Sequence, residues 1–263
     1  MPYKSQILFL GRVLVVVAVV VGAKTLANLL SWQPISLNAL FSGIIAGNVF
    51  LMGFLLSGVL SDYKESERIP GELGACLENM AQEVRGIGVA KPEAEIGPCL
   101  TQISKLGDDI LRWFYKKIDT EQVVEGVNEL TVQFDRLQPW TQGTFVGRLK
   151  QEQSNLRRTI TRIDTVRETS FVSSAYLLAD TTTLLLCTGL VLVKMDSFNE
   201  SLFFAGIISF LLVFLLTLIR DLDNPFGYYE RFSGADVSLR PFEDTVGRLK
   251  ALAESDASAA KRS

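Results

Sequence analysis

The chain of 263 residues contains no histidine and only three cysteines. Without histidine, neither a Ser/His/Asp triad nor a histidine-bearing zinc site can form. Cys76, Cys99 and Cys187 lie far apart, which is typical of small buried apolar residues rather than of a disulfide framework or a metal site. No glycine-rich phosphate loop follows a strand pattern. We therefore expect no enzyme, no cofactor and no bound metal ion.

The chain also lacks an excess of basic residues. Its formal net charge is -3, with 26 Lys and Arg residues against 29 Asp and Glu residues. Proteins that bind nucleic acid through its phosphates usually carry a clear positive excess, so we expect no nucleic-acid partner.

Charge is scarce in four long stretches of this chain, which is 48% hydrophobic. The stretches cover 7–27, 39–60, 171–193 and 202–219. A helix that spans a bilayer needs about 20 mostly apolar residues, so the sequence predicts four transmembrane helices in contact with lipid. No small-residue cleavage site follows the first stretch, which favours an uncleaved helix over a signal peptide.

Basic residues are distributed unevenly between the connecting segments. Lys24, near the end of the first span, is the only basic residue close to the link that follows, and the link after the third span has Lys194. The long segment between the second and third spans carries several basic residues near the membrane, including Arg157, Arg158 and Arg162. Because Lys and Arg favour the cytoplasmic side, we expect an inner (plasma) membrane protein with both termini and this segment in the cytoplasm.

The long middle segment has apolar residues at helical spacing. In its first part they recur at steps of four, three, four and three, at Leu73, Leu77, Met80, Val84 and Ile87. Similar stripes follow over 96–118, over 123–137 with Thr120 as the expected helix cap, and from Phe145 to 163. The predicted fold is therefore an all-α membrane protein whose cytoplasmic helical bundle is inserted between the second and third spans.

This reading divides the chain into five parts. Residues 1–61 form the first transmembrane helix pair, 62–170 the cytoplasmic helical domain, and 171–219 the second transmembrane pair. We expect 220–254 to pack on the helical domain, with a short helix that ends near Ala253. The small polar residues 255–263 are predicted to be a disordered tail. No Pro or Gly separates Leu149 from Leu186, so the last bundle helix is expected to continue into the third span.

Small residues recur along the second span at helical spacing, as at Gly43 and Gly47. One interpretation is close helix packing. In the other, the span surrounds the axis of a homo-oligomer, and Phe50 and Phe54 form an apolar constriction that gates by dewetting. Gly47, Phe50, Phe54 and Ser57 are then the pore-lining candidates.

Two charged residues within the predicted spans are candidates for an ion pathway. Asp180 is the only charge in the third span, and a carboxylate there is expected to face a cavity or a partner such as Arg12. Lys24 is expected near the outer mouth, where it either anchors the helix at the interface or raises the local concentration of anions. For Asn48, in the second span, the sequence suggests no partner.

The fourth span is followed by acids and a rigid turn. Pro225 prevents the helix from continuing and favours an extended Asn224, and Phe226 and Gly227 complete the turn. Asp221 and Asp223 would oppose the helix dipole. They therefore need partners, either nearby arginines of the middle segment, backbone amides of the turn, or a cation. We interpret residues 221–227 as a joint between membrane and cytoplasmic parts.

The order of these segments resembles that of the bestrophins, and more closely a bacterial bestrophin-like family of unknown function. The matching stretches are 61–65 (Ser-Asp-Tyr-Lys-Glu), 221–227 (Asp-Leu-Asp-Asn-Pro-Phe-Gly), 232–234 (Phe-Ser-Gly) and 237–241 (Val-Ser-Leu-Arg-Pro). The resemblance implies a pentameric anion channel whose second helix lines the pore. Calcium-gated bestrophins continue after Pro-Phe-Gly with a run of acids, whereas Tyr228 and its successors include one acid and one base. A calcium clasp is therefore not expected.

Three functions remain open from the sequence. The first is a homo-oligomeric ion channel that conducts inorganic anions such as chloride. The second is a membrane-anchored interaction or sensory module that binds a partner through its helical segment. The third is a proton-driven stator of the flagellar-motor type, which shares the four spans, but the expected Pro/Gly pattern in spans three and four is missing.

Overall fold

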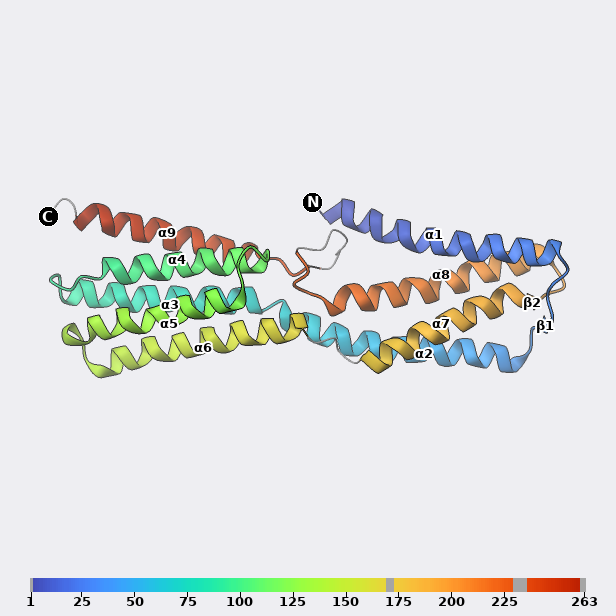
Figure 1. Cartoon of the computed structure of the whole chain (residues 1–263), viewed down its shortest axis with the longest axis horizontal. Coiled ribbons are helices and arrows are strands. Elements are labelled where there is room, and N and C mark those ends of the chain that lie inside the picture. The colour runs from blue at the N-terminus through green and yellow to red at the C-terminus, as the bar shows by residue number, and fades with distance from the viewer. Residues whose placement is uncertain (1, 169–172, 229–235, 261–263) are drawn as a thin grey trace. The chain divides into compact units, whose positions relative to one another are not determined.

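The computed structural model describes residues 2–168, 173–228 and 236–260 (Figure 1). These residues form helices α1 to α9, a short 3-10 helix and two strands of two residues each. They divide into two compact units. The first unit comprises 2–64, 173–225 and 236, and the second comprises 65–168, 226–228 and 237–260. Each unit is described by itself below.

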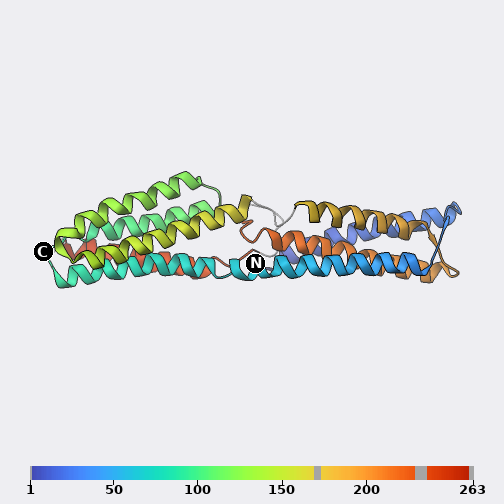
Figure 2. The same cartoon turned by 90° about the horizontal axis from the view of Figure 1, so that it is seen from below.

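The first unit contains α1 (Pro2–Leu29), α2 (Ala39–Ser66), α7 (Ser173–Leu192) and α8 (Phe198–Asp223). The boundary between the units falls within the last turn of α2, after residue 64. Helix α1 packs along α8 and α7, and α7 packs on α8. Helix α2 lies at the edge of the unit in both views (Figures 1 and 2). It is held by a cluster of buried side chains from three helices: Met52, Leu55, Val59, Ala179, Leu186, Leu212 and Ile219.

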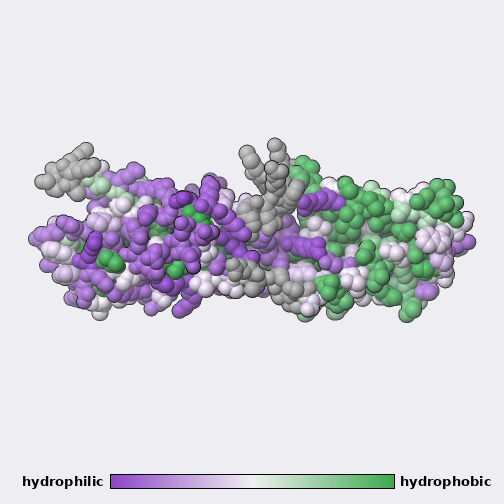
Figure 3. All heavy atoms as spheres, viewed as in Figure 1, coloured by the Kyte–Doolittle hydropathy of each residue, from purple (hydrophilic) through white to green (hydrophobic). Residues whose placement is uncertain are grey.

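All four helices of this unit are long and apolar enough to cross a membrane. The face seen in Figure 3 is largely hydrophobic over this unit and largely hydrophilic over the second unit. The four transmembrane helices predicted from the sequence are thus confirmed by length and composition. Helix α8 continues beyond the apolar span predicted over 202–219, and its last turn includes Arg220, Asp221 and Asp223.

A short pair of parallel strands, which the sequence did not predict, joins the two short links of this unit. Strand β1 (Ile35–Ser36) pairs in parallel with β2 (Val193–Lys194). The pair ties the link between α1 and α2 to the link between α7 and α8. Two residues are too few to show a strand periodicity, so no sequence pattern marks this pairing.

The second unit contains α3 (Ile69–Ala90), α4 (Gly97–Phe114), α5 (Thr120–Leu137), the 3-10 helix η1 (Gln138–Trp140), α6 (Gly143–Glu168) and α9 (Arg240–Ala260). Helices α3 and α4 pack on each other and on α9, while α5 and α6 pack on each other and cover the other sides of α4 and α3. The apolar stripes predicted for α3 and α5 are buried throughout. The all-helical bundle is confirmed.

Three details of the second unit differ from expectation, and a fourth prediction lies outside the described residues. Phe145 is 37% exposed and its ring lies against the Arg148 guanidinium, while Val146 takes the buried position. The α5 cap is Asp119, in a capping box with Gln122, and not Thr120. Helix α9 continues to Ala260, so the predicted end near Ala253 and the disordered tail over 255–260 are wrong. The predicted continuity of α6 with α7 falls on 169–172, outside the described residues.

Cys99, on α4, is expected to resist alkylation in the native protein. Its side chain is fully buried, and this burial raises the pKa of the thiol to about 12. The reactive thiolate therefore stays scarce at pH 8 and becomes abundant only as the pH approaches that value. We expect mass spectrometry after iodoacetamide treatment at pH 8 to find Cys99 unmodified in native protein and modified in denaturant. Rapid native labelling at pH 8 would contradict the buried position.

Candidate functional site

Helix α2 carries the predicted pore-lining residues on one exposed face. Phe50 and Phe54 are 79% and 69% exposed, and Gly47 and Ser57 are exposed one turn to either side. The buried residues Met52, Leu55 and Val59 occupy the opposite face of the same helix. The helix therefore uses one face to pack on α7 and α8. The described part of the protomer leaves the other face uncovered, and we call it the Phe50 face.

The backbone of the Phe50 face is also open. A methyl group added at Gly43, Gly47 or Gly53 would meet no atom of the described chain within 4 Å. Close helix packing was one of the two interpretations of the glycine spacing, and packing inside the protomer does not explain these glycines. They leave exposed backbone without side chains beside the rings of Phe50 and Phe54.

Asn48, on the packed side of α2, has a partner that the sequence did not suggest. The Thr182 hydroxyl of α7 donates to its side-chain oxygen at 2.8 Å. Asn48 is buried, and its amide nitrogen meets no hydrogen-bond acceptor among the described residues. This contact adds a polar link to the apolar cluster that holds α2 against α7.

Asp180 forms an ion pair with Arg220 of α8. The sequence analysis predicts Arg12 as one partner for this carboxylate, whereas the pair that the structure shows is with Arg220. The pair is not enclosed by the protomer, because the side chains of Asp180 and Arg220 remain 36% and 56% exposed. Charged groups within membrane helices normally face protein or water rather than lipid.

The end of α8 follows the predicted helix stop. The helix ends at Asp223, and Asn224 leaves the helical region with φ −115° and ψ 73°. Pro225 and Phe226 then form a turn, and both are buried together with Gly227. Inside the first unit, the buried Tyr176 hydroxyl lies near the Asp223 carboxylate, without a hydrogen bond of normal geometry.

Two of the three arginines proposed as partners of Asp221 and Asp223, Arg157 and Arg162, have contacts within the second unit. Arg162 pairs with Glu65, and Arg157 donates a hydrogen bond to Asn128. The expected joint function of residues 221–227 remains a prediction.

Phe226 is fully buried in the second unit, where its ring lies 5.8 Å from that of Phe114 at the end of α4. Phe114 also contacts the rings of Trp113, Tyr228 and Phe242. The Tyr228 hydroxyl donates to the Val237 carbonyl at 2.6 Å. Residues 232–234, which contributed to the family resemblance, lie outside the described part of the chain.

Arg167, near the end of α6, completes this aromatic cluster. Its guanidinium lies 4.6 Å from the centre of the Trp113 ring and donates to the carbonyl oxygens of Trp113 and Phe114. A cation suits these carbonyls because they carry the negative end of the α4 dipole. The sequence reasoning missed Arg167, since nothing in its local pattern separates it from other surface arginines.

Lys24 lies deeper in the protein than expected. The sequence placed it near an open mouth, whereas its side chain is 1% exposed and donates to the carbonyl oxygens of Val191 and Val193. The backbone of β2 therefore holds the ammonium group, because the β1–β2 pair brings this link against the end of α1.

Comparison with known proteins shows a likeness in structure only. No protein-family model and no curated protein matches the sequence. A bacterial bestrophin homologue from Klebsiella pneumoniae matches with a TM-score of 0.73 and 15% identity, over 95% of this chain and 98% of that one. A tryptophan-to-alanine variant of that protein gives a TM-score of 0.78 at 16% identity, over 93% and 98%. A tyrosine-to-alanine variant gives 0.74 at 17%, over 94% and 99%.

These matches cover nearly the whole of both chains, so they include the helices of both units. The chain therefore has the fold of the bacterial bestrophin homologues.

Proposed function

We propose that the chain forms a homo-oligomeric ion channel, with α2 lining the pore and anions such as chloride as the conducted ions. The observation that carries this proposal is the division of α2 into two faces. Met52, Leu55 and Val59 pack inside the protomer, while Phe50 and Phe54 project from it. An apolar ring of such residues around a shared axis can gate a pore by dewetting.

The Asp180–Arg220 pair supports assembly of several copies. It lies on transmembrane helices, yet both side chains remain partly exposed in the single chain. An exposed ion pair is unfavourable against hydrocarbon and acceptable beside water or another subunit. We therefore place this face of α7 and α8 at a subunit contact or along the ion pathway, where Asp180 keeps its predicted role.

The placement in the membrane is part of the proposal. Lys and Arg are concentrated in the second unit and around its connections, which favours a cytoplasmic location for that unit and for both termini. The β1–β2 pair and the Lys24 region then lie toward the outer side of the inner membrane.

The test is a flux measurement on purified protein in liposomes, with the oligomeric state measured in parallel by native mass spectrometry. We expect one oligomer larger than a dimer and chloride flux above that of empty liposomes. Separate liposomes loaded with sodium or potassium salts distinguish an anion pathway from a cation pathway. A monomer or dimer with no flux for any of these ions would contradict the proposal. Co-purification of another protein, lost on deletion of 71–140, would then favour the interaction module.

A further inference from the structure

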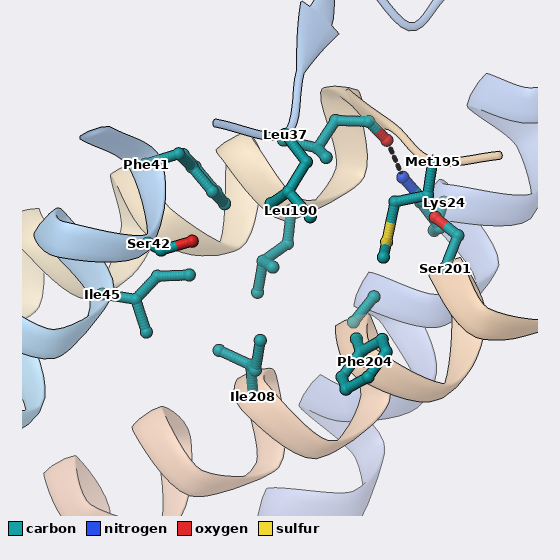
Figure 4. A pocket seen from close by; sticks show the side chains of 12 residues that line it. Lys24, Leu37, Phe41, Ser42, Ile45, Leu190, Met195, Ser201, Phe204 and Ile208 are labelled. Carbon is teal, nitrogen blue, oxygen red and sulfur yellow. Dashed lines mark hydrogen bonds between the residues drawn. The ribbon is translucent and has the colours of Figure 1, made fainter. Parts of the chain in front are cut away.

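A cavity of about 280 Å³ lies within the first unit, at the end where β1 and β2 pair. Its walls come from the last turns of α1 and α7 and the first turns of α2 and α8 (Figure 4). Most of the lining is apolar, including Phe41, Leu190 and Ile208. The volume lies just below the range of about 300–1,000 Å³ that is usual for small-molecule sites, so only a small ligand fits.

Lys24 gives this apolar cavity a buried positive group. An ammonium group has three N–H donors, and two acceptors are the carbonyl oxygens of Val191, at 3.4 Å, and Val193. Among the described residues that line the cavity, none carries a carboxylate. A buried charge without an opposite charge is unfavourable, and a bound anion would offset that cost.

Ser201 adds a second polar group on the same side. Its side chain is 4% exposed, and its hydroxyl has no hydrogen-bond partner within the described part of the protein. Figure 4 shows Ser201 and Lys24 together at one side of the cavity, with Phe41 and Ile45 on the opposite wall. A buried hydroxyl normally has a partner, so this one is available to a ligand.

We propose that the cavity binds a small amphiphilic carboxylate, meaning an anionic head on a short apolar body. The carboxylate accepts hydrogen bonds from Lys24 Nζ and Ser201 Oγ, and the apolar body packs against Phe41, Leu190 and Ile208. Such a ligand comes either from water, as a free short-chain acid, or from the bilayer, as a fatty acid. This site does not depend on α2 lining a pore.

The test measures binding to the full-length protein in lipid nanodiscs, with octanoate as the probe. Octanol and octylamine at equal concentrations have the same apolar body without the negative charge. We expect octanoate to raise the thermal midpoint saturably and the other two to have no saturable effect. Lys24→Met should weaken the apparent affinity for octanoate about tenfold to a hundredfold, since a hydrogen bond to a charged group is lost. Lys194→Met, at the exposed neighbour of Val193, is the control and should bind normally.

Ile208→Trp keeps Lys24 and fills the cavity from its apolar wall. It therefore tests whether octanoate binds in this cavity even if Lys24→Met does not fold. We expect it to abolish saturable octanoate binding. Equal octanoate affinity in either folded variant and the wild type, or equal saturable binding of octanol, would overturn the proposal. Fatty acid that co-purifies with the wild type and is lost in Ile208→Trp identifies the bilayer as the source. Octanoate binding without co-purified fatty acid identifies a free acid.

Discussion

Replacing both Phe50 and Phe54 with alanine is expected to raise ion flux through the reconstituted protein by about tenfold or more. These rings are the largest groups on the exposed face of α2. Removing them widens and hydrates an apolar constriction. A barrier lowered by only about 1.4 kcal/mol already gives a tenfold faster passage. Stopped-flow flux into liposomes measures the rate at a fixed protein-to-lipid ratio.

The control for this experiment is Phe203→Ala. Phe203 is also an exposed aromatic residue of a transmembrane helix, but it lies on α8 and contacts Phe204. Its loss should leave the flux within error of the wild type. If the double α2 variant forms the normal oligomer and its flux equals that of the wild type, the Phe50 face does not form the constriction.

Replacing Phe226 with alanine is expected to lower the free energy of unfolding of the second unit by about 3–5 kcal/mol. The side chain is fully buried beside Phe114, so its removal leaves a cavity inside the aromatic cluster. Denaturant unfolding followed by tryptophan fluorescence measures the change, because the Trp113 ring lies 5.4 Å from that of Phe114.

Two variants bracket this result. Phe226→Leu keeps most of the apolar volume and should cost less than about 1.5 kcal/mol. Phe145→Ala removes a ring from the same unit, but a partly exposed one that contacts Arg148, and should cost less than about 1 kcal/mol. A loss for Phe226→Ala no larger than that for Phe145→Ala would show that the Pro-Phe-Gly segment does not anchor in this core.

Helix positions were predictable where a long apolar pattern decided them. The stripe from Leu73 to Ile87 is buried throughout, because its apolar side chains recur on one face of the helix and that face packs against the core. The sequence pattern wrongly predicted Phe145 as a core residue at the start of α6. A shift of the apolar stripe by one position along the helix puts Val146 in the core and Phe145 at the surface. The error at Ala253 arose because α9 packs on α3 and α4, and small polar residues can extend a helix already held by such packing.

The candidate site was predictable in part. The sequence offered Phe50 and Phe54 as pore-lining candidates and Asp180 as an ion-pathway candidate, and periodicity placed both phenylalanines on one face of the second span. It could not choose Arg220 over Arg12 as the partner of Asp180, because both lie toward the same end of the predicted spans. Ser201 and Thr182 carry no local signal at all, because hydroxyl groups are common in membrane helices and only a neighbouring helix gives them a role.

The amino-acid sequence by itself determined the four apolar helices, the helical bundle and the stop at Pro225, because each depends on composition, period or backbone chemistry within a short segment. The tertiary structure alone decided which side of α2 is packed, that Arg220 meets Asp180, and that Lys24 is buried against β2. Those outcomes depend on which helix faces lie against each other, and contacts between residues far apart in the chain leave no mark in the local pattern.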